Sequence, residues 1–131
     1  SLYKGLSSTS SRADIWYKNQ RMMHAIAQEF GIPFFSFLEP TIYSGHYQLS
    51  LSEQESIEDD MLIGMRYREQ AQNFYYSSKL YTADTAYIYD LTGLFDGLNG
   101  IMIDDRHCND RGTLLIAKQI YNIIKGNSDL F

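Results

Sequence analysis

The sequence predicts an α/β fold in which helices alternate with short strands of a parallel sheet. Two observations lead to this fold class: segments with apolar residues at helical spacing, and short continuous apolar runs between them. Their order along the chain is helix, strand, helix, strand, helix, which is typical of parallel sheets with right-handed crossovers. We therefore expect about three helices and about two short strands.

The first helix is expected to begin at a capping box. Ser11 and Asp14 are spaced so that each side chain can accept a hydrogen bond from the other's backbone amide. Apolar residues follow at helical spacing until Gly31, which is suited to a C-cap, and Pro33 prevents the helix from resuming. Residues 1–10 are rich in serine and lack periodicity, so they are predicted to be a loop.

The first strand and a long second helix come next. Residues 32–38 form a continuously apolar run, as in a strand that helices cover on both faces, and residues 41–51 are loop-like. Ser52 and Glu55 have the spacing of a second capping box, followed by a helix to about Leu80.

The second strand and the last helix complete the pattern. Residues 86–89 form a short run rich in β-formers that ends at Asp90. Residues 91–100 contain three glycines and are expected to be mostly turn. Residues 113–125 carry a broad apolar stripe at helical spacing, which predicts an amphipathic helix.

Two strands make a sheet with open edges, which is marginal by itself. We therefore interpret residues 1–131 as a single domain or as part of one. The sheet would be completed either by pairing with another chain, as in a homodimer, or by strands that precede residue 1.

Composition narrows the classes of partner. The net charge is −5, with acidic and basic residues mixed along the chain, so no basic stripe indicates nucleic acid. No apolar run is long enough to span a membrane. Cys108 is the single cysteine, which excludes an internal disulfide and leaves the compartment open. With no cluster of His, Cys and carboxylates at ligand spacing, neither a metal nor a cofactor is predicted.

The candidate functional residues are Asp104 and His107. A carboxylate and an imidazole three residues apart on a turn can reach each other. The carboxylate would then accept the Nδ1 proton and leave Nε2 free to take a proton from a nucleophile. Both residues follow a short apolar run, and loops after parallel strands are where open α/β sheets place their sites.

Neighbouring residues have structural interpretations. Asp105 is interpreted as a solvated turn carboxylate, and Cys108 as a partly buried thiol that points away from His107. Asn109 or Asp110 is expected to cap the last helix. The serines between residues 7 and 11 are not preceded by a strand, which a nucleophile elbow requires.

The chain resembles the C-terminal half of the SGNH (GDSL-type) hydrolases, a family of serine esterases and acylhydrolases. Three stretches carry the resemblance: Asp104-x-x-His107 with Asn109 and Gly112 before the last helix, a strand running from Gly31-Ile32-Pro33 to Glu39-Pro40, and the segment Tyr89–Asp96. It is closest to bacterial members that act on acylated sugars and polysaccharides.

The resemblance implies a three-layer α/β/α sandwich, a flavodoxin-like arrangement with a parallel sheet, of which this chain is the C-terminal part. It implies that His107 is the general base and that Asp104 orients it. The family's Gly-Asp-Ser and its Gly-x-Asn-Asp do not occur in this sequence, so the nucleophilic serine would lie outside it. The substrate would be an O-acyl ester, such as an acetylated carbohydrate.

Two other classes of protein stay open. The first is a non-catalytic α/β interaction domain that associates through its exposed sheet edge. The second is a small flavodoxin-like or response-regulator-like domain, which fits less well because neither an acidic Mg²⁺ cluster nor a phosphate-binding loop is visible.

Overall fold

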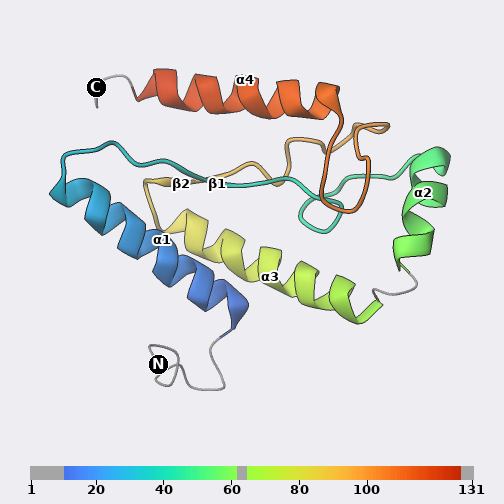
Figure 1. Ribbon diagram of the computed structural model, residues 1–131, viewed down its shortest axis with the longest axis horizontal. Coiled ribbons are helices and arrows are strands. Elements are labelled where there is room, and N and C mark those ends of the chain that lie inside the picture. Colours follow the sequence, from blue (N-terminus) through green and yellow to red (C-terminus); the bar gives the residue numbers. More distant parts are fainter. Residues whose placement is uncertain (1–10, 62–64, 128–131) are drawn as a thin grey trace.

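The computed structural model describes residues 11–61 and 65–127 and has a mixed α/β architecture (Figure 1). The described part contains four helices and one parallel sheet of two strands. In chain order the elements are α1 (Arg12–Glu29), β1 (Ser36–Leu38), α2 (Leu51–Met61), α3 (Met65–Ala83), β2 (Ile88–Asp90) and α4 (Asp110–Gly126). Figure 1 shows α4 on one side of the strands and both α1 and α3 on the other.

Helix α1 begins as the sequence predicts. The backbone N–H of Ser11 donates to Asp14 (2.9 Å), and the N–H of Asp14 donates to the Ser11 hydroxyl (3.2 Å), which completes the capping box. Gly31 follows the helix with a φ of 64°, a backbone conformation that glycine adopts at low cost. The helix packs against α3, where the rings of Tyr17 and Tyr81 stack with centroids 4.3 Å apart.

Both strands are shorter than predicted. The apolar run 32–38 contributes only Ser36–Leu38 to the sheet, and the second run contributes Ile88–Asp90. Ser36 pairs with Ile88, and Leu38 pairs with Asp90. Apolar content indicates which residues tolerate burial, but the length of a strand depends on how many residues find a partner.

The predicted helix over residues 52–80 is wrong in two respects. The structure describes two helices there, α2 and α3, so the described chain has four helices rather than about three. The capping box at the start of α2 also lies two residues earlier than predicted. The N–H of Ser50 donates to Glu53 (2.7 Å), and the N–H of Glu53 donates to the Ser50 hydroxyl (3.3 Å). Ser52 is exposed.

A compact cluster of apolar side chains lies beside the start of α4. Phe95, Ile101 and Met102 are buried at its centre. Leu115 and Ile116 of α4 pack against this cluster. The cluster therefore joins the residues that follow β2 to the last helix, and it supports the loop that carries Asp104 and His107.

Among the described helices, none is long and apolar enough to cross a membrane.

Candidate functional site

The loop over residues 101–109 is a tight antiparallel turn. The N–H of Ile103 donates to the carbonyl oxygen of His107 (2.8 Å), and the N–H of Asn109 donates to that of Ile101 (2.8 Å). These backbone bonds bring the two arms of the loop together. Asp104 and His107 consequently lie at the tip of the turn.

The structure brings Asp104 and His107 into direct contact. The distance from His107 Nδ1 to Asp104 Oδ2 is 2.7 Å. The other carboxylate oxygen, Oδ1, accepts the backbone N–H groups of Arg106 (2.8 Å) and His107 (2.7 Å). One carboxylate thus holds both the backbone of the turn and the imidazole ring.

The Asp104 carboxylate is suited to stay ionised. Partial burial works to raise its pKa, but the hydrogen bonds from the Arg106 and His107 amides and from the His107 ring outweigh this effect. The pKa of Asp104 therefore lies below its ordinary value of 3.8. An ionised Asp104 favours the tautomer in which Nδ1 carries the proton and Nε2 is the basic nitrogen.

The imidazole is accessible from outside. The side chain of His107 is 78% exposed, whereas that of Asp104 is 36% exposed. His107 is therefore the member of the pair that a docking group can reach from outside.

Asp105 is more than the solvated turn carboxylate that the sequence predicts. Its side chain is 19% exposed and accepts a hydrogen bond from the Tyr43 hydroxyl (3.1 Å). Its carbonyl oxygen accepts the N–H of Ile42 (3.3 Å). Asp105 therefore fastens the turn to the loop that follows β1, a contact that sequence spacing does not reveal.

Cys108 and Asn109 connect the turn to α4. The Cys108 thiol is partly buried and lies 3.7 Å from the Thr113 hydroxyl, on the side of α4. Asn109 caps the helix, because its side-chain oxygen accepts the N–H of Gly112 (3.2 Å). Its side-chain amide also donates to the carbonyl of Gly100 (2.9 Å). Of the two predicted caps, the structure selects Asn109.

Glu53 and Tyr47 are the site residues that sequence analysis missed. One carboxylate oxygen of Glu53 accepts the backbone amides of Ile101 and Met102, both at 2.9 Å, where the arm of the turn begins. The Tyr47 hydroxyl donates to the same oxygen. The signal for Glu53 in the sequence is its spacing from Ser50. This spacing fits a capping box as well as the spacing of Ser52 and Glu55 does.

The other polar candidates lie elsewhere. His24 stacks on Tyr87 with ring centroids 3.8 Å apart, and His46 is exposed in the loop before α2. Ser11 caps α1, and the serines at positions 7, 8 and 10 lie outside the described residues.

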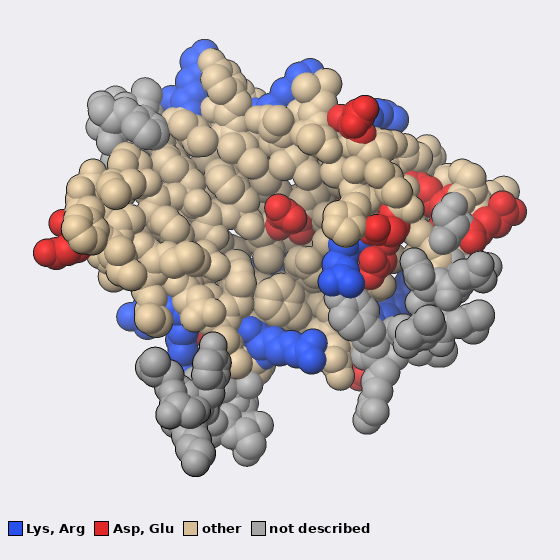
Figure 2. Space-filling model, in the orientation of Figure 1, with Lys and Arg blue, Asp and Glu red and all other residues tan. Residues whose placement is uncertain are grey.

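Within residues 11–61 and 65–127, no group of three or more His, Cys, Asp or Glu is placed to hold a metal ion. On the face in Figure 2, Lys and Arg lie in separate small groups.

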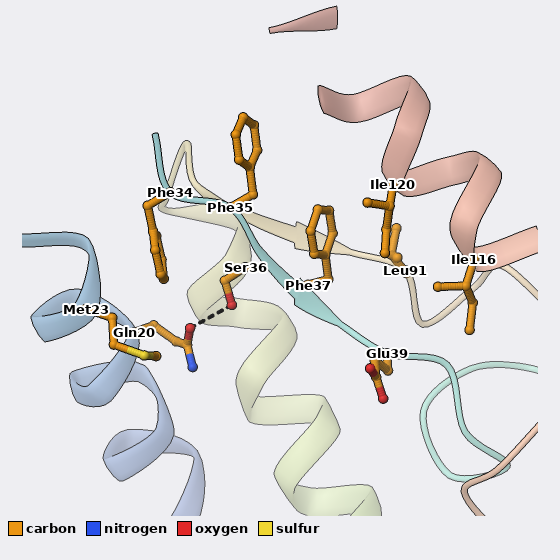
Figure 3. Close-up of a pocket in the computed structure, with 10 residues that line it drawn as sticks. All are labelled: Gln20, Met23, Phe34, Phe35, Ser36, Phe37, Glu39, Leu91, Ile116 and Ile120. Atoms are coloured by element: carbon orange, nitrogen blue, oxygen red, sulfur yellow. Dashed lines mark hydrogen bonds between the residues drawn. The ribbon is translucent and has the colours of Figure 1, made fainter. Parts of the chain in front are cut away.

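An apolar groove runs along β1 between α1 and α4 (Figure 3). Its volume is about 340 Å³. Phe35 and Phe37 point toward the side of α4, and Phe34 and Ser36 point toward α1. The Ser36 hydroxyl donates to Gln20 of α1 (2.6 Å). The remaining lining residues are Met23, Glu39, Leu91, Ile116 and Ile120.

The groove lies at an open edge of the sheet. Ser36 N–H donates to Tyr87 O (2.8 Å), and Leu38 O accepts from Leu91 N–H (3.0 Å), so residues 36 and 38 face β2. Backbone groups alternate in direction along a strand, so those of Phe37 face the groove.

Comparison with protein-family models finds no match for this chain, and comparisons with curated proteins and with solved structures find none either.

Proposed function

We propose that this chain supplies the general base of an SGNH-type serine esterase or acylhydrolase, with the nucleophilic serine on a segment outside residues 1–131. The observation that carries this proposal is the 2.7 Å contact between His107 Nδ1 and Asp104 Oδ2 on an exposed turn. An oriented imidazole of this kind serves to activate a hydroxyl nucleophile.

The reaction follows from the orientation of the imidazole. Nε2 of His107 removes the proton of the serine hydroxyl as the serine oxygen attacks the acyl carbonyl. The resulting imidazolium, stabilised by Asp104, returns the proton to the departing alcohol as its C–O bond breaks. Water then attacks the acyl-serine, again losing a proton to Nε2, and the carboxylic acid and free serine are released.

The layering of the elements supports a three-layer sandwich. Helix α4 lies on one side of the sheet, and α1 and α3 lie on the other (Figure 1). The open edge of β1 offers backbone groups and an apolar groove to a further strand. The substrate class, an O-acyl ester such as an acetylated carbohydrate, comes from the resemblance alone.

The test uses the full-length protein that contains this chain. We expect a fluorophosphonate probe, which reacts with activated serines, to label a peptide outside residues 1–131. We expect His107→Ala to lower turnover of p-nitrophenyl acetate at least about 10³-fold and to slow labelling in parallel, because the hydroxyl loses its base. Asp104→Asn should lower turnover less than His107→Ala, because the general base remains in place.

His46→Ala is the matched control, since this histidine is also exposed but lies on another loop. It should retain full turnover. Full activity in His107→Ala, or labelling of a serine within residues 1–131, would overturn the proposal.

The open sheet edge favours a second candidate, a non-catalytic interaction domain that forms a homodimer through β1. In this case the 131-residue chain would dimerise in light scattering, and Phe37→Lys, which places a charge in the groove, would return it to a monomer. Tyr76→Lys, on an exposed residue of α3, serves as the control. A monomer at every concentration would exclude this candidate.

A further inference from the structure

Glu53 has more hydrogen-bond partners than helix capping requires. Its Oε2 accepts the N–H of Ser50 (2.7 Å), which is the capping interaction. Its Oε1 points the other way and accepts the consecutive backbone amides of Ile101 and Met102 together with the Tyr47 hydroxyl. Glu53 is only 6% exposed. A buried carboxylate is normally tolerated only where such donors surround it.

Two consecutive amides that converge on one oxygen form an anion-binding arrangement of the backbone. Here the anion is the carboxylate of Glu53, which lies 48 residues before Ile101 in the sequence. The Tyr47 hydroxyl lies beside the same amides, 2.9 Å from the nitrogen of Ile101. Both anchors act on the arm of the turn that precedes Asp104.

The anchored arm leads directly to the candidate site. Met102 forms a backbone bridge with Cys108, the residue after His107. Ile103 N–H bonds to the His107 carbonyl (2.8 Å). Holding residues 101 and 102 therefore sets the position of both arms of the turn. Asp104 meets His107 at the tip of this turn.

We infer that Glu53 is a positioning residue that holds the Asp104–His107 turn in the geometry in which Asp104 accepts the Nδ1 proton. This inference rests on the proposed function for its catalytic consequence, but not for its structural content. Burial works to raise the pKa of Glu53, and the hydrogen bonds from Tyr47, Ser50 and Met102 outweigh it and lower the pKa to about 2. The anchor is therefore charged throughout the neutral range.

The experiment is ¹⁵N NMR of the 131-residue chain, which reports the tautomer of each histidine ring. In the wild type, His107 should be mainly in the form protonated at Nδ1. In Glu53→Gln the nitrogen signals should move toward those of a rapidly exchanging mixture, because a neutral amide holds the turn less firmly. Tyr47→Phe removes one anchor while leaving the carboxylate, and it should produce a smaller shift in the same direction.

Ser50→Ala separates the two roles of Glu53, because it removes the hydroxyl half of the capping box and leaves the bonds to residues 101 and 102. It should leave the His107 signals unchanged, as should Glu55→Ala on the exposed side of α2. Unchanged His107 signals in both Glu53→Gln and Tyr47→Phe would overturn the inference. An equal shift in Ser50→Ala would also overturn it, by showing that helix capping alone matters.

Turnover of the full-length protein provides the second measurement. Glu53→Gln should lower kcat about tenfold with little change in KM, since the base and not the substrate contact is disturbed. If the protein hydrolyses no ester, the proposed function fails while the tautomer result still decides the role of Glu53. A tautomer shift without any change in kcat would overturn the catalytic consequence alone.

Discussion

Gly112, in the first turn of α4, illustrates how a single residue shapes the site. A Cβ added there would lie 2.6 Å from Cγ2 of Ile101 and 2.6 Å from Cβ of Cys108. Both distances are far below ordinary contact, so only a residue without a side chain lets α4 approach the turn this closely. The glycine thus permits the packing that joins the last helix to the Asp104–His107 turn.

We expect Gly112→Ala to destabilise the chain by about 1–3 kcal/mol, the usual cost of forcing extra atoms into a packed site. Urea denaturation followed by circular dichroism measures this loss. Gly126→Ala is the control at the other end of α4, where a Cβ would meet nothing within 4 Å. An unchanged unfolding midpoint for Gly112→Ala would contradict close packing between α4 and the turn.

The lowered pKa of Glu53 predicts how the free energy of unfolding changes in acid. Its folded-state pKa of about 2 lies below its ordinary value of 4.5, so its stabilising contribution is present above pH 4.5. That contribution is lost as pH falls from 4.5 toward 2, and the difference corresponds to roughly 3 kcal/mol. Denaturation between pH 6 and pH 2.5 should show a smaller loss of stability in Glu53→Gln than in the wild type. Equal losses in both proteins would show that Glu53 does not drive acid unfolding.

At the level of secondary structure, the capping residue Asn109 contributes two hydrogen bonds that tie α4 to the turn. Asn109 accepts a bond from the first turn of the helix through its oxygen and donates to Gly100 through its nitrogen. Gly100 has a φ of 66° and immediately precedes the arm that Glu53 holds. One side chain therefore connects the start of α4 to both ends of the loop.

Substitutions at Asn109 separate these two contacts. Asn109→Ala should lower stability by about 1 kcal/mol or more, since it loses the cap as well as the bond to Gly100. Asn109→Asp keeps an acceptor for the Gly112 amide and loses only the donor, so its loss should be smaller. Thermal unfolding of both variants, with Asn122→Ala on the exposed face of α4 as a control, measures the difference. Equal losses would mean that the Gly100 bond dominates.

At the scale of the whole molecule, the described fold is incompletely covered. The sheet has two strands, and β1 leaves one edge open beside an apolar groove of about 340 Å³. Large apolar residues of α1 and of its C-cap are also exposed, among them Ile26 at 59% and the cap residue Phe30 at 73%. Exposed apolar surface of this kind marks association sites in proteins. The hydrolase and the interaction domain proposed above both use the open edge of β1.

Hydrogen exchange of single amides reports whether this edge is occupied. The Leu38 amide faces β2 in the ladder, whereas the Phe37 amide faces the groove. In the dilute 131-residue chain, Phe37 should exchange faster than Leu38. In a protein where a further strand completes the sheet, the two amides should be protected to similar extents. Strong protection of Phe37 in a dilute monomer would contradict an open edge.

Features formed by neighbouring residues could be predicted from the sequence. The capping box of Ser11 and Asp14, the cap at Asn109 and the contact between Asp104 and His107 all join residues three positions apart. Local backbone geometry brings such pairs within reach of each other, although distant residues such as Glu53 then hold the turn in place. The catalytic role of Asp104 and His107 stays a prediction.

Features that depend on distant partners could not be predicted in this way. Asp105 contacts Tyr43 across 62 residues, and strand lengths follow from how much of β1 finds β2. Periodicity indicates which residues tolerate burial, but it does not identify their partners. The sequence also predicts about three helices where the described residues form four, because the apolar stripe over residues 52–80 does not show that two helices share it.

Local spacing is enough to predict a mixed α/β fold with two short strands, and the pair Asp104 and His107 on a turn. How α2 begins depends instead on contacts with distant residues. Ser50 with Glu53 and Ser52 with Glu55 have the same spacing, and nothing nearby distinguishes them. The buried amides of Ile101 and Met102 require an acceptor, and Glu53 is the carboxylate that the fold brings to them.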